Sequence, residues 1–167
     1  TNFVSILIIT VMNDELMSQQ KLGNEKLNVF IGKWHTTGDI YGKNGNVVGK
    51  VNAFDTYAWL PGEYAMIHYI DSQMGDIKIH GVEIIGYDPA RQAYFVPFFD
   101  NQGSVGSEEL RLEGKTWVWY GENVMGVNYH RCKAVFEMEN LIVACHEYSD
   151  DNRIWNKWMD IKLIKTT

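Results

Sequence analysis

Two pairs of side chains in this sequence could transfer protons, His68 with His80 and His130 with Glu147. A neutral imidazole can bind a metal or haem, and a histidine shielded from water has a pKa tuned by its surroundings for acid–base work. A carboxylate beside a histidine orients the ring as a base. The two pairs therefore predict catalytic candidates, provided that the fold turns each pair toward a common interior.

The first pair depends on the loop between two strand-like segments. A loop of three or five residues places His68 directly across from His80, with Met66 facing Val82 and Tyr64 facing Ile84. If that face is interior, two imidazoles project into an apolar and aromatic cavity. In the alternative interpretation one histidine lies near the rim and both make ordinary hydrogen bonds. A loop of four residues would break the pairing.

The second pair depends on the hairpin "FEMENLIVACHE". A two-residue turn at Glu139-Asn140 places Phe136 opposite Val143, and it directs His130 and Glu147 inward while His146 points outward. A slip of one residue would reverse these assignments, because strand side chains alternate between the two faces. The alternative is a buried polar pair near one end of the fold.

Aromatic residues are the other candidates for a binding site. Six Trp and nine Tyr are many for 167 residues, and Trp117 and Trp119 share one face of a strand. Such side chains form either plain core or the wall of a cavity. The predicted ligand-binding residues are Tyr64, Met66, His68, His80, Val82, Trp117, Trp119 and Phe136, with His130 on the same wall.

Several kinds of site receive no support from the sequence. It has no Gly-x-Ser-x-Gly, His-Glu-x-x-His, phosphate-loop or Rossmann glycine pattern. A metal bound by His68 and His80 lacks a third ligand, since Glu83 faces away from His80 by strand alternation. No metal site and no obligatory cofactor are therefore expected.

The rhythm of the chain predicts the fold that must position these groups. Turn signals such as "KNGN", "LPGE" and "DNQGS" recur every eight to twelve residues and separate about ten strand-like runs. Nearly every connection is short enough for a hairpin. We expect an all-β protein, a closed antiparallel meander barrel, because closure removes the exposed edge strands and leaves room for one small ligand. One amphipathic helix is expected from about Leu16 to Ile31.

The hairpin around Asn44-Gly45 can be registered, because Asn-Gly favours a two-residue type I′ turn. It pairs Asp39 with Lys50 on an outer face and turns Trp34 inward. His35 then points to solvent. Trp34 is expected to plug the closed end of the barrel.

Composition and charge restrict the partners. A net charge of −6 without a Lys/Arg stripe argues against nucleic acid, and Cys132 and Cys145 are expected to be reduced, buried thiols. The apolar stretch 3–12 is too short to span a membrane and lacks the flanks of a signal peptide. These features favour the cytoplasm and no membrane partner.

The chain divides into an extension, residues 1–21, and a barrel domain, residues 22–167. We expect the apolar stretch 3–12 to pack on the barrel or on a second subunit of a homodimer. The alternative is read-through upstream of a natural start at Met12 or Met17.

Three features resemble one known family. They are Gly32-x-Trp34 after a helix, the block "GYDPARQAYFVPFFDNQG" from Gly86, and Trp155 and Trp158 before the last strand. The chain resembles the bacterial family called domain of unknown function fifteen-seventy-nine, a lipocalin-like (calycin) barrel group, over roughly residues 22 to 165. The resemblance extends more distantly to nitrobindins and fatty-acid-binding proteins, and it implies a barrel that holds a ligand. The paired arginines of fatty-acid-binding barrels have no counterpart, which argues against classical fatty-acid binding.

The sequence therefore predicts a barrel that binds a hydrophobic or aromatic small molecule. The alternative is a cofactor-independent enzyme of isomerase or cyclase type, in which His68, His80 or the His130/Glu147 pair moves a proton. A weaker alternative is a haem-binding barrel with a histidine ligand.

Overall fold

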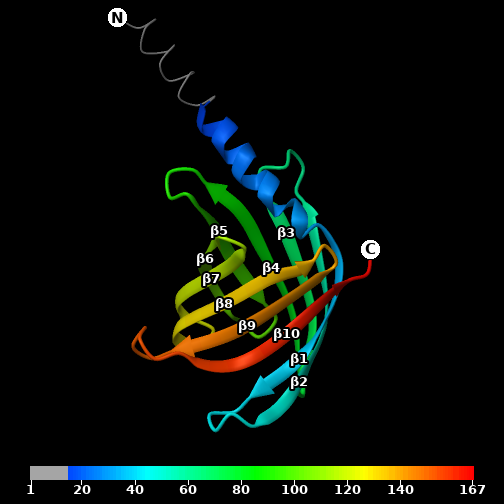
Figure 1. The fold of residues 1–167 in the computed structure, drawn as a ribbon, viewed down its shortest axis with the longest axis vertical. Helices are drawn as coiled ribbons and strands as arrows, with labels where there is room; N and C mark the ends of the chain where they lie inside the picture. The colour runs from blue at the N-terminus through cyan, green and yellow to red at the C-terminus, as the bar shows by residue number, and fades with distance from the viewer. Residues whose placement is uncertain (1–14) are drawn as a thin grey trace, which may run out of the picture.

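A computed structural model of the chain describes residues 15–167. It contains an α-helix over residues 15–25, a short 3-10 helix and ten strands (Figure 1). The elements after the α-helix are η1 (Lys26–Val29), β1 (Gly32–Tyr41), β2 (Val47–Trp59), β3 (Met66–Met74), β4 (Ile77–Asp88), β5 (Ala93–Asp100), β6 (Val105–Glu113), β7 (Thr116–Val124), β8 (Val127–Met138), β9 (Leu141–Ser149) and β10 (Asn156–Lys165). The apolar stretch 3–12 lies outside the described residues.

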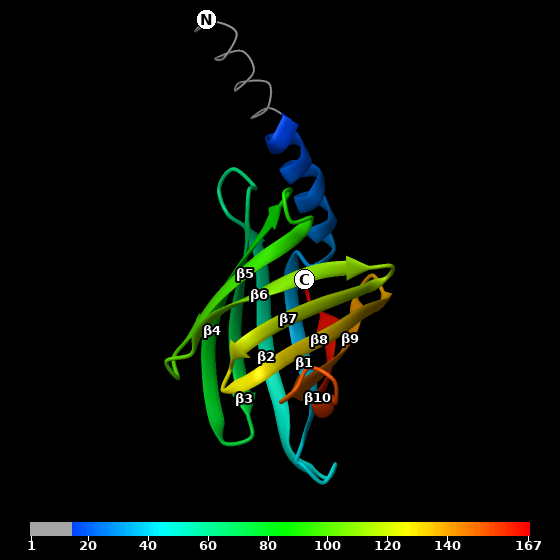
Figure 2. The same cartoon turned by 90° about the vertical axis from the view of Figure 1, so that its left-hand side faces the viewer.

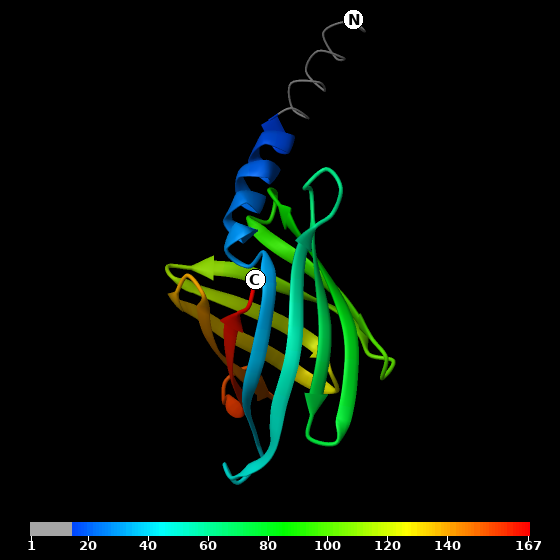
Figure 3. The ribbon, with the colours of Figure 1, turned by 90° about the vertical axis from the view of Figure 1, so that its right-hand side faces the viewer.

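The strands close into an antiparallel meander barrel. Each strand pairs with its neighbour in sequence, and β1 pairs with β10 to complete the circle. The predicted fold class is confirmed. Figures 2 and 3 show the barrel wall from two opposite sides. The helix lies at one end of the barrel, and the β1–β2 and β3–β4 hairpins lie at the other end.

The 3-10 helix η1 and the residue that follows it fill one end of the barrel. Leu27 and Phe30 are almost completely buried, and the Phe30 ring packs against Tyr57, Trp117, Trp119 and Phe136 with centroid distances of 5.1 to 5.9 Å. Such tilted and edge-on contacts are favourable arrangements for aromatic rings. Phe30 therefore closes the barrel interior at the helix end, which is called the floor.

Hydrogen bonds attach the helix to the barrel rim. The Asn24 side chain donates to the carbonyls of Glu63 and Tyr64 and accepts from the Tyr87 amide, and the Tyr94 hydroxyl donates to the Gly23 carbonyl at 2.6 Å. Asn24 is only 2% exposed, so these bonds satisfy a polar group that burial would otherwise penalise.

The hairpin predicted around Asn44-Gly45 is confirmed over most of its length. Asp39 pairs with Lys50 and forms an ion pair with it, and His35 lies opposite Phe54 on the outer face. A register shift between Ile40 and Tyr41 alters only the end of the hairpin. Trp34 is 1% exposed and points inward, as predicted.

Trp34 is fixed from two sides. Its indole N–H donates to the Phe30 carbonyl at 2.7 Å, which ties β1 to the end of the helix. Lys165 Nζ lies 5.3 Å from the centroid of the Trp34 ring. A lysine of the last strand therefore lies over the Trp34 ring.

Candidate functional site: a polar belt inside the barrel

The barrel encloses a cavity of about 560 Å³ between Phe30 at the floor and the hairpins at the opposite end. This volume lies in the range of small-molecule sites, which are mostly apolar with a few converging polar groups. Apolar and aromatic side chains make up most of its wall, including Tyr57, Ile79, Phe98, Trp119, Met125, Ile142, Trp158 and Met159. Two hydrogen-bonded networks interrupt this wall.

The first network crosses four neighbouring strands. His68 on β3 contacts Asp55 on β2 through Nε2 at 3.0 Å and Glu83 on β4 through Nδ1 at 2.9 Å. Thr36 on β1 donates a short hydrogen bond to Asp55. The Tyr57 ring stacks on the imidazole at 3.9 Å between centroids. Both ring nitrogens thus have a carboxylate partner.

The charge of His68 follows from these contacts. Burial by itself would lower the pKa of His68, but the hydrogen bonds to Asp55 and Glu83 and the two negative charges outweigh burial and raise this pKa to about 9. At neutral pH the first network therefore holds an imidazolium between two carboxylates.

The second network runs from Glu108 on β6 through His130 on β8 to His146 on β9. Glu108 Oε1 lies 2.5 Å from His130 Nδ1, and His130 Nε2 lies 3.2 Å from His146 Nδ1. Trp158 covers both imidazoles edge-on. Glu108 and His130 are 4% and 2% exposed, so this relay is among the most deeply buried polar groups of the barrel.

Burial sets the protonation of this relay. Burial lowers the pKa of His146 to about 3, so His146 is neutral at physiological pH. Burial is also the main cause of a raised pKa at Glu108, which the contact with His130 opposes. A carboxyl group whose pKa is raised and a neutral imidazole form a unit that can exchange a proton.

The relay ends at an atom without a partner. His146 Nε2 is buried and, within residues 15–167, has no hydrogen-bond partner. Buried polar atoms are nearly always paired, so this nitrogen marks the position where a bound molecule can complete the network. His146 also lines the cavity, so the unpaired nitrogen belongs to a side chain of the cavity wall.

A glycine on the intervening strand makes the relay possible. Gly121 on β7 pairs with His130, and a Cβ atom on it would lie 2.9 Å from Glu108 Oε1 and 2.6 Å from a methyl of Val124. Any larger side chain would occupy the space that the Glu108 carboxylate needs. The missing side chain lets Glu108 reach across β7 to His130.

The predicted site residues fall in four places: the cavity wall, the packed core, a loop and the outer face of the barrel. His68, His130 and Trp119 lie on the cavity wall. Met66, Trp117 and Phe136 belong to the packed core around Phe30, below the cavity. Tyr64 lies in the loop between β2 and β3 and is 48% exposed.

The predicted juxtaposition of His68 and His80 was wrong. The β3–β4 connection has two residues, Gly75 and Asp76, so His68 pairs with Glu83 and His80 pairs with Asp71. Glu83 faces away from His80, as expected, and because His80 points outward this places Glu83 inside the barrel. His80 points to the outside and forms an ion pair of 3.3 Å with Asp71.

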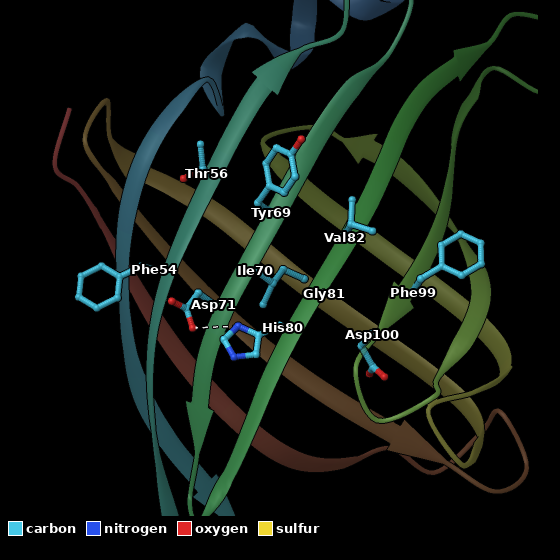
Figure 4. A pocket seen from close by; sticks show the side chains of 10 residues that line it. All are labelled: Phe54, Thr56, Tyr69, Ile70, Asp71, His80, Gly81, Val82, Phe99 and Asp100. Atoms are coloured by element: carbon cyan, nitrogen blue, oxygen red, sulfur yellow. Dashed lines mark ion pairs between the residues drawn. The ribbon is translucent and has the colours of Figure 1, made fainter.

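Val82 shares the outer face with His80. There the two residues line a shallow depression over β2 to β5, with Phe54, Tyr69 and Phe99 beside them (Figure 4). These three aromatic side chains are more than half exposed. The depression lies on the outside of the sheet, and it shares part of its lining with the cavity, namely Ile70, Gly81, Val82, Phe99 and Asp100.

The predicted pairing of His130 with Glu147 was also wrong. A bulge between Phe136 and Met138 shifts the β8–β9 register, so that Cys132 faces His146 and Arg131 faces Glu147. Glu147 forms ion pairs with Arg131 and Lys133 on the other face of β9. His130 points inward as predicted, and the carboxylate that orients it is Glu108.

Four residues of the networks were not predicted from the sequence as site residues: Asp55, Glu83, Glu108 and His146. A signal existed for Asp55, because the alternation that turns Val51 and Ala53 inward on β2 turns Asp55 inward as well. Glu108 lies two strands from His130, and no local pattern connects them. Within the described residues no group of His, Cys, Asp and Glu side chains has the arrangement of a metal site.

Comparison with known proteins identifies the family. A family model described as "Protein of unknown function (DUF1579)" matches residues 23–163. The chain belongs to the DUF1579 family. No curated protein matches this DUF1579 chain.

Two solved structures share the fold of this DUF1579 protein. The crystal structure of Rv2717c from M. tuberculosis has a TM-score of 0.63 and 7% identity, covering 87% of this chain and 98% of that chain. The S-type phycobiliprotein lyase CPES from Guillardia theta has a TM-score of 0.59 and 10% identity, covering 89% of this chain and 97% of that chain. At these identities the likeness concerns the fold alone. Among the described residues no helix is long and apolar enough to cross a membrane.

Proposed function

We propose that this DUF1579 barrel binds a hydrophobic or aromatic small molecule in its interior, as a cytoplasmic protein. The observation that carries the proposal is the cavity of about 560 Å³, whose mostly apolar wall includes His146, a side chain with a buried Nε2 that has no hydrogen-bond partner within residues 15–167. Apolar walls supply affinity, and a few fixed polar groups supply orientation. A barrel built only for stability would fill this space with side chains.

A cavity-filling substitution tests this proposal. Ala53 points into the cavity from β2, while Ala58 lies on the outer face of the same strand, so Ala53→Leu and Ala58→Leu form a matched pair. We expect Ala53→Leu to weaken binding of the fluorescent probe N-phenyl-1-naphthylamine by about tenfold or more, corresponding to about 1.4 kcal/mol. Ala58→Leu should bind the probe like the parent protein.

Mass spectrometry of molecules released on denaturation gives a second readout. The parent protein and Ala58→Leu should release the same compound after purification, and Ala53→Leu should release less of it. Equal probe binding by the two variants would contradict a site inside the barrel.

A second candidate function is proton transfer on the bound molecule, of the isomerase or cyclase type. The Glu108–His130–His146 relay favours it, because a proton accepted at His146 Nε2 can pass from His146 Nδ1 to His130 Nε2 and from His130 Nδ1 to Glu108, whose pKa is raised by burial. Ring opening of 5-nitrobenzisoxazole, which begins with loss of one C–H proton to a base, provides a general probe. We expect His146→Phe to slow this reaction by about a hundredfold.

The control for this reaction is His80→Phe, which removes an imidazole from the outer face. Its rate should match that of the parent protein. Equal rates for His146→Phe and His80→Phe would leave the protein as a carrier without catalytic base.

Haem is the weakest candidate ligand. His146 Nε2 offers an imidazole donor, but the cavity wall carries Asp55, Glu83 and Glu108 and, within residues 15–167, no Lys or Arg. The two propionates of haem would meet this negative wall. The residues present therefore fit haem poorly, and we assign it no chemistry here.

A further inference from the structure

The charges inside the cavity point to the class of ligand. Carboxylates of Asp55, Glu83 and Glu108 belong to the two networks, and Asp100 lines the same space. The cationic group opposite them is the imidazolium of His68, and no Lys or Arg side chain from the described residues lines the wall. The wall is therefore net negative.

This charge acts at short range and with little screening. Asp55, His68 and Glu108 are each less than 10% exposed. Charges in a buried site interact more strongly than they do at a surface, and salt screens them less. Glu83 and Glu108 belong to different networks, yet the charge of Glu83 contributes to the raised pKa of Glu108, so the two networks act on the same space.

A ligand carboxylate would find no good partner in this interior. Barrels that take carboxylates pair them with Arg or Lys, since burying an anion without a counter-charge is costly. The imidazolium of His68 already contacts two carboxylates through both of its ring nitrogens, so it has no free N–H for a third. An added anion would therefore meet mainly repulsion.

His146 Nε2 is the polar contact that remains open. When Glu108 is ionised and accepts from His130 Nδ1, a neutral His130 accepts at Nε2 from His146 Nδ1. His146 Nε2 is then an acceptor without a partner among the described residues, on a side chain that lines the cavity. An amine or alcohol group on the ligand can donate to it, whereas a carboxylate cannot.

We infer that this cavity selects an apolar, aromatic molecule that carries an amine or hydroxyl group, neutral or cationic, which donates to His146 Nε2, and that it excludes the corresponding carboxylates. The inference rests on the proposed function and specifies its ligand class. Electrostatic matching of this kind also determines which ligands are rejected.

A matched series of naphthalenes tests the inference at pH 7.5. The competitors are 2-(aminomethyl)naphthalene, 2-naphthalenemethanol and 2-naphthoate, each displacing N-phenyl-1-naphthylamine from the full chain. We expect the amine and the alcohol to compete at concentrations at least tenfold lower than naphthoate. Equal or tighter competition by naphthoate would overturn the inference and leave the proposed function intact.

Charge-neutralising variants locate the origin of the selectivity. Glu83→Gln removes one negative charge from the wall and retains an amide that can contact His68. It should lower the preference for the amine over naphthoate by about fivefold or more. Asp71→Asn makes the same change of charge on the outer face, where Asp71 pairs with His80, and should preserve the preference. The same narrowing in both variants would overturn a site inside the barrel.

The hydrogen bond to His146 has its own variant. His146→Phe retains an aromatic ring without the acceptor. It should weaken binding of 2-naphthalenemethanol by about tenfold relative to binding of 2-methylnaphthalene. An unchanged ratio of alcohol to methylnaphthalene would show that His146 Nε2 does not contact the ligand. If neither the probe nor any competitor binds to the parent protein, the proposed function itself is overturned.

Discussion

At the scale of single residues, the most unusual environment is that of His68. Asp55 and Glu83 occupy both ring nitrogens, and Tyr57 covers one face of the ring. Removing one carboxylate would leave burial, which lowers the pKa, with less to oppose it. The protonation of His68 is therefore sensitive to a single substitution.

We predict that His68 titrates in the folded protein near pH 9 and that Asp55→Asn moves its pKa toward or below the ordinary value for histidine. Two-dimensional NMR of the imidazole resonances measures both values. Asp71→Asn, which removes a carboxylate from the outer face, should leave the titration of His68 unchanged. Titration of His68 near pH 6.5 in the parent protein would contradict the assignment.

Gly121 is the second residue on which the site depends. A methyl group at this position would lie within 3 Å of both Glu108 and Val124, and the Glu108 carboxylate can move away only by leaving His130. We predict that Gly121→Ala breaks the Glu108–His130 hydrogen bond and costs about 1–3 kcal/mol of folding free energy. The NMR signal of the His130 Nδ1 proton should disappear into exchange with water.

A matched glycine on β4 provides the control. The nearest atoms to a Cβ on Gly86 lie at 3.6 and 3.7 Å, which is ordinary van der Waals contact. Gly86→Ala should therefore keep the His130 proton and most of the stability. If both variants retain the proton signal, Glu108 reaches His130 without needing the space at Gly121.

At the scale of the elements, hairpin chemistry decided which features the sequence could predict. The Asn44-Gly45 turn fixed the β1–β2 register, and with it the inward position of Trp34. Strand alternation on β8 correctly predicted His130 and Cys132 as inward. Ten strands and closure followed from the spacing of turns and from the need to cover sheet edges.

The failures have equally local causes. Gly75 has a φ of 57°, which suits glycine and allows a two-residue connection where a longer loop was expected. In β8 one extra residue near Glu137 shifts the pairing by one, and this exchanged His146 for Glu147 on the inner face. Contacts across an intervening strand, such as Glu108 with His130, depend on the whole barrel and leave no local pattern.

Phe30 connects the helical region to the barrel wall, and its replacement shows how much this closure stabilises the fold. It joins the end of the helix to aromatic side chains of β2, β7 and β8, and it is 2% exposed. We predict that Phe30→Ala lowers the free energy of unfolding by about 3–5 kcal/mol, through lost burial and the void left behind. Equilibrium unfolding in urea measures the change.

Leu22 supplies the comparison within the same helical region, since it is 63% exposed. Leu22→Ala should change the free energy of unfolding by less than about 0.5 kcal/mol. A loss of similar size in both variants would mean that the helix stabilises the barrel through its whole surface, with no special role for the Phe30 floor.

At the scale of the whole molecule, the two networks make stability depend on pH in opposite directions. The folded pKa of His68 is raised to about 9, so its contribution is complete below the unfolded value of about 6.5 and is lost as the pH rises toward 9. The folded pKa of His146 is lowered to about 3, so its contribution is complete above about pH 6.5 and is lost as the pH falls toward 3. Stability should therefore be greatest near pH 6.5.

The alkaline side gives the sharper prediction. The Cys132 thiol and the Tyr57 hydroxyl also have raised pKa values, but their contributions to stability are lost only above the ordinary values of about 8.5 and about 10, so His68 dominates the change between pH 6.5 and 8.5. In this interval unfolding releases up to one proton per molecule from His68, which corresponds to about 1.36 kcal/mol per pH unit. The free energy of unfolding should therefore fall by about 2–3 kcal/mol between pH 6.5 and 8.5. Urea unfolding at the two pH values measures the difference.

Two variants separate this effect from a general loss of stability. His68→Gln should be less stable at pH 6.5 than the parent protein but should lose little more at pH 8.5, because the titrating group is gone. His80→Gln removes a histidine from the outer face and should keep the slope of the parent protein. A parent protein equally stable at both pH values would contradict an imidazolium held between Asp55 and Glu83.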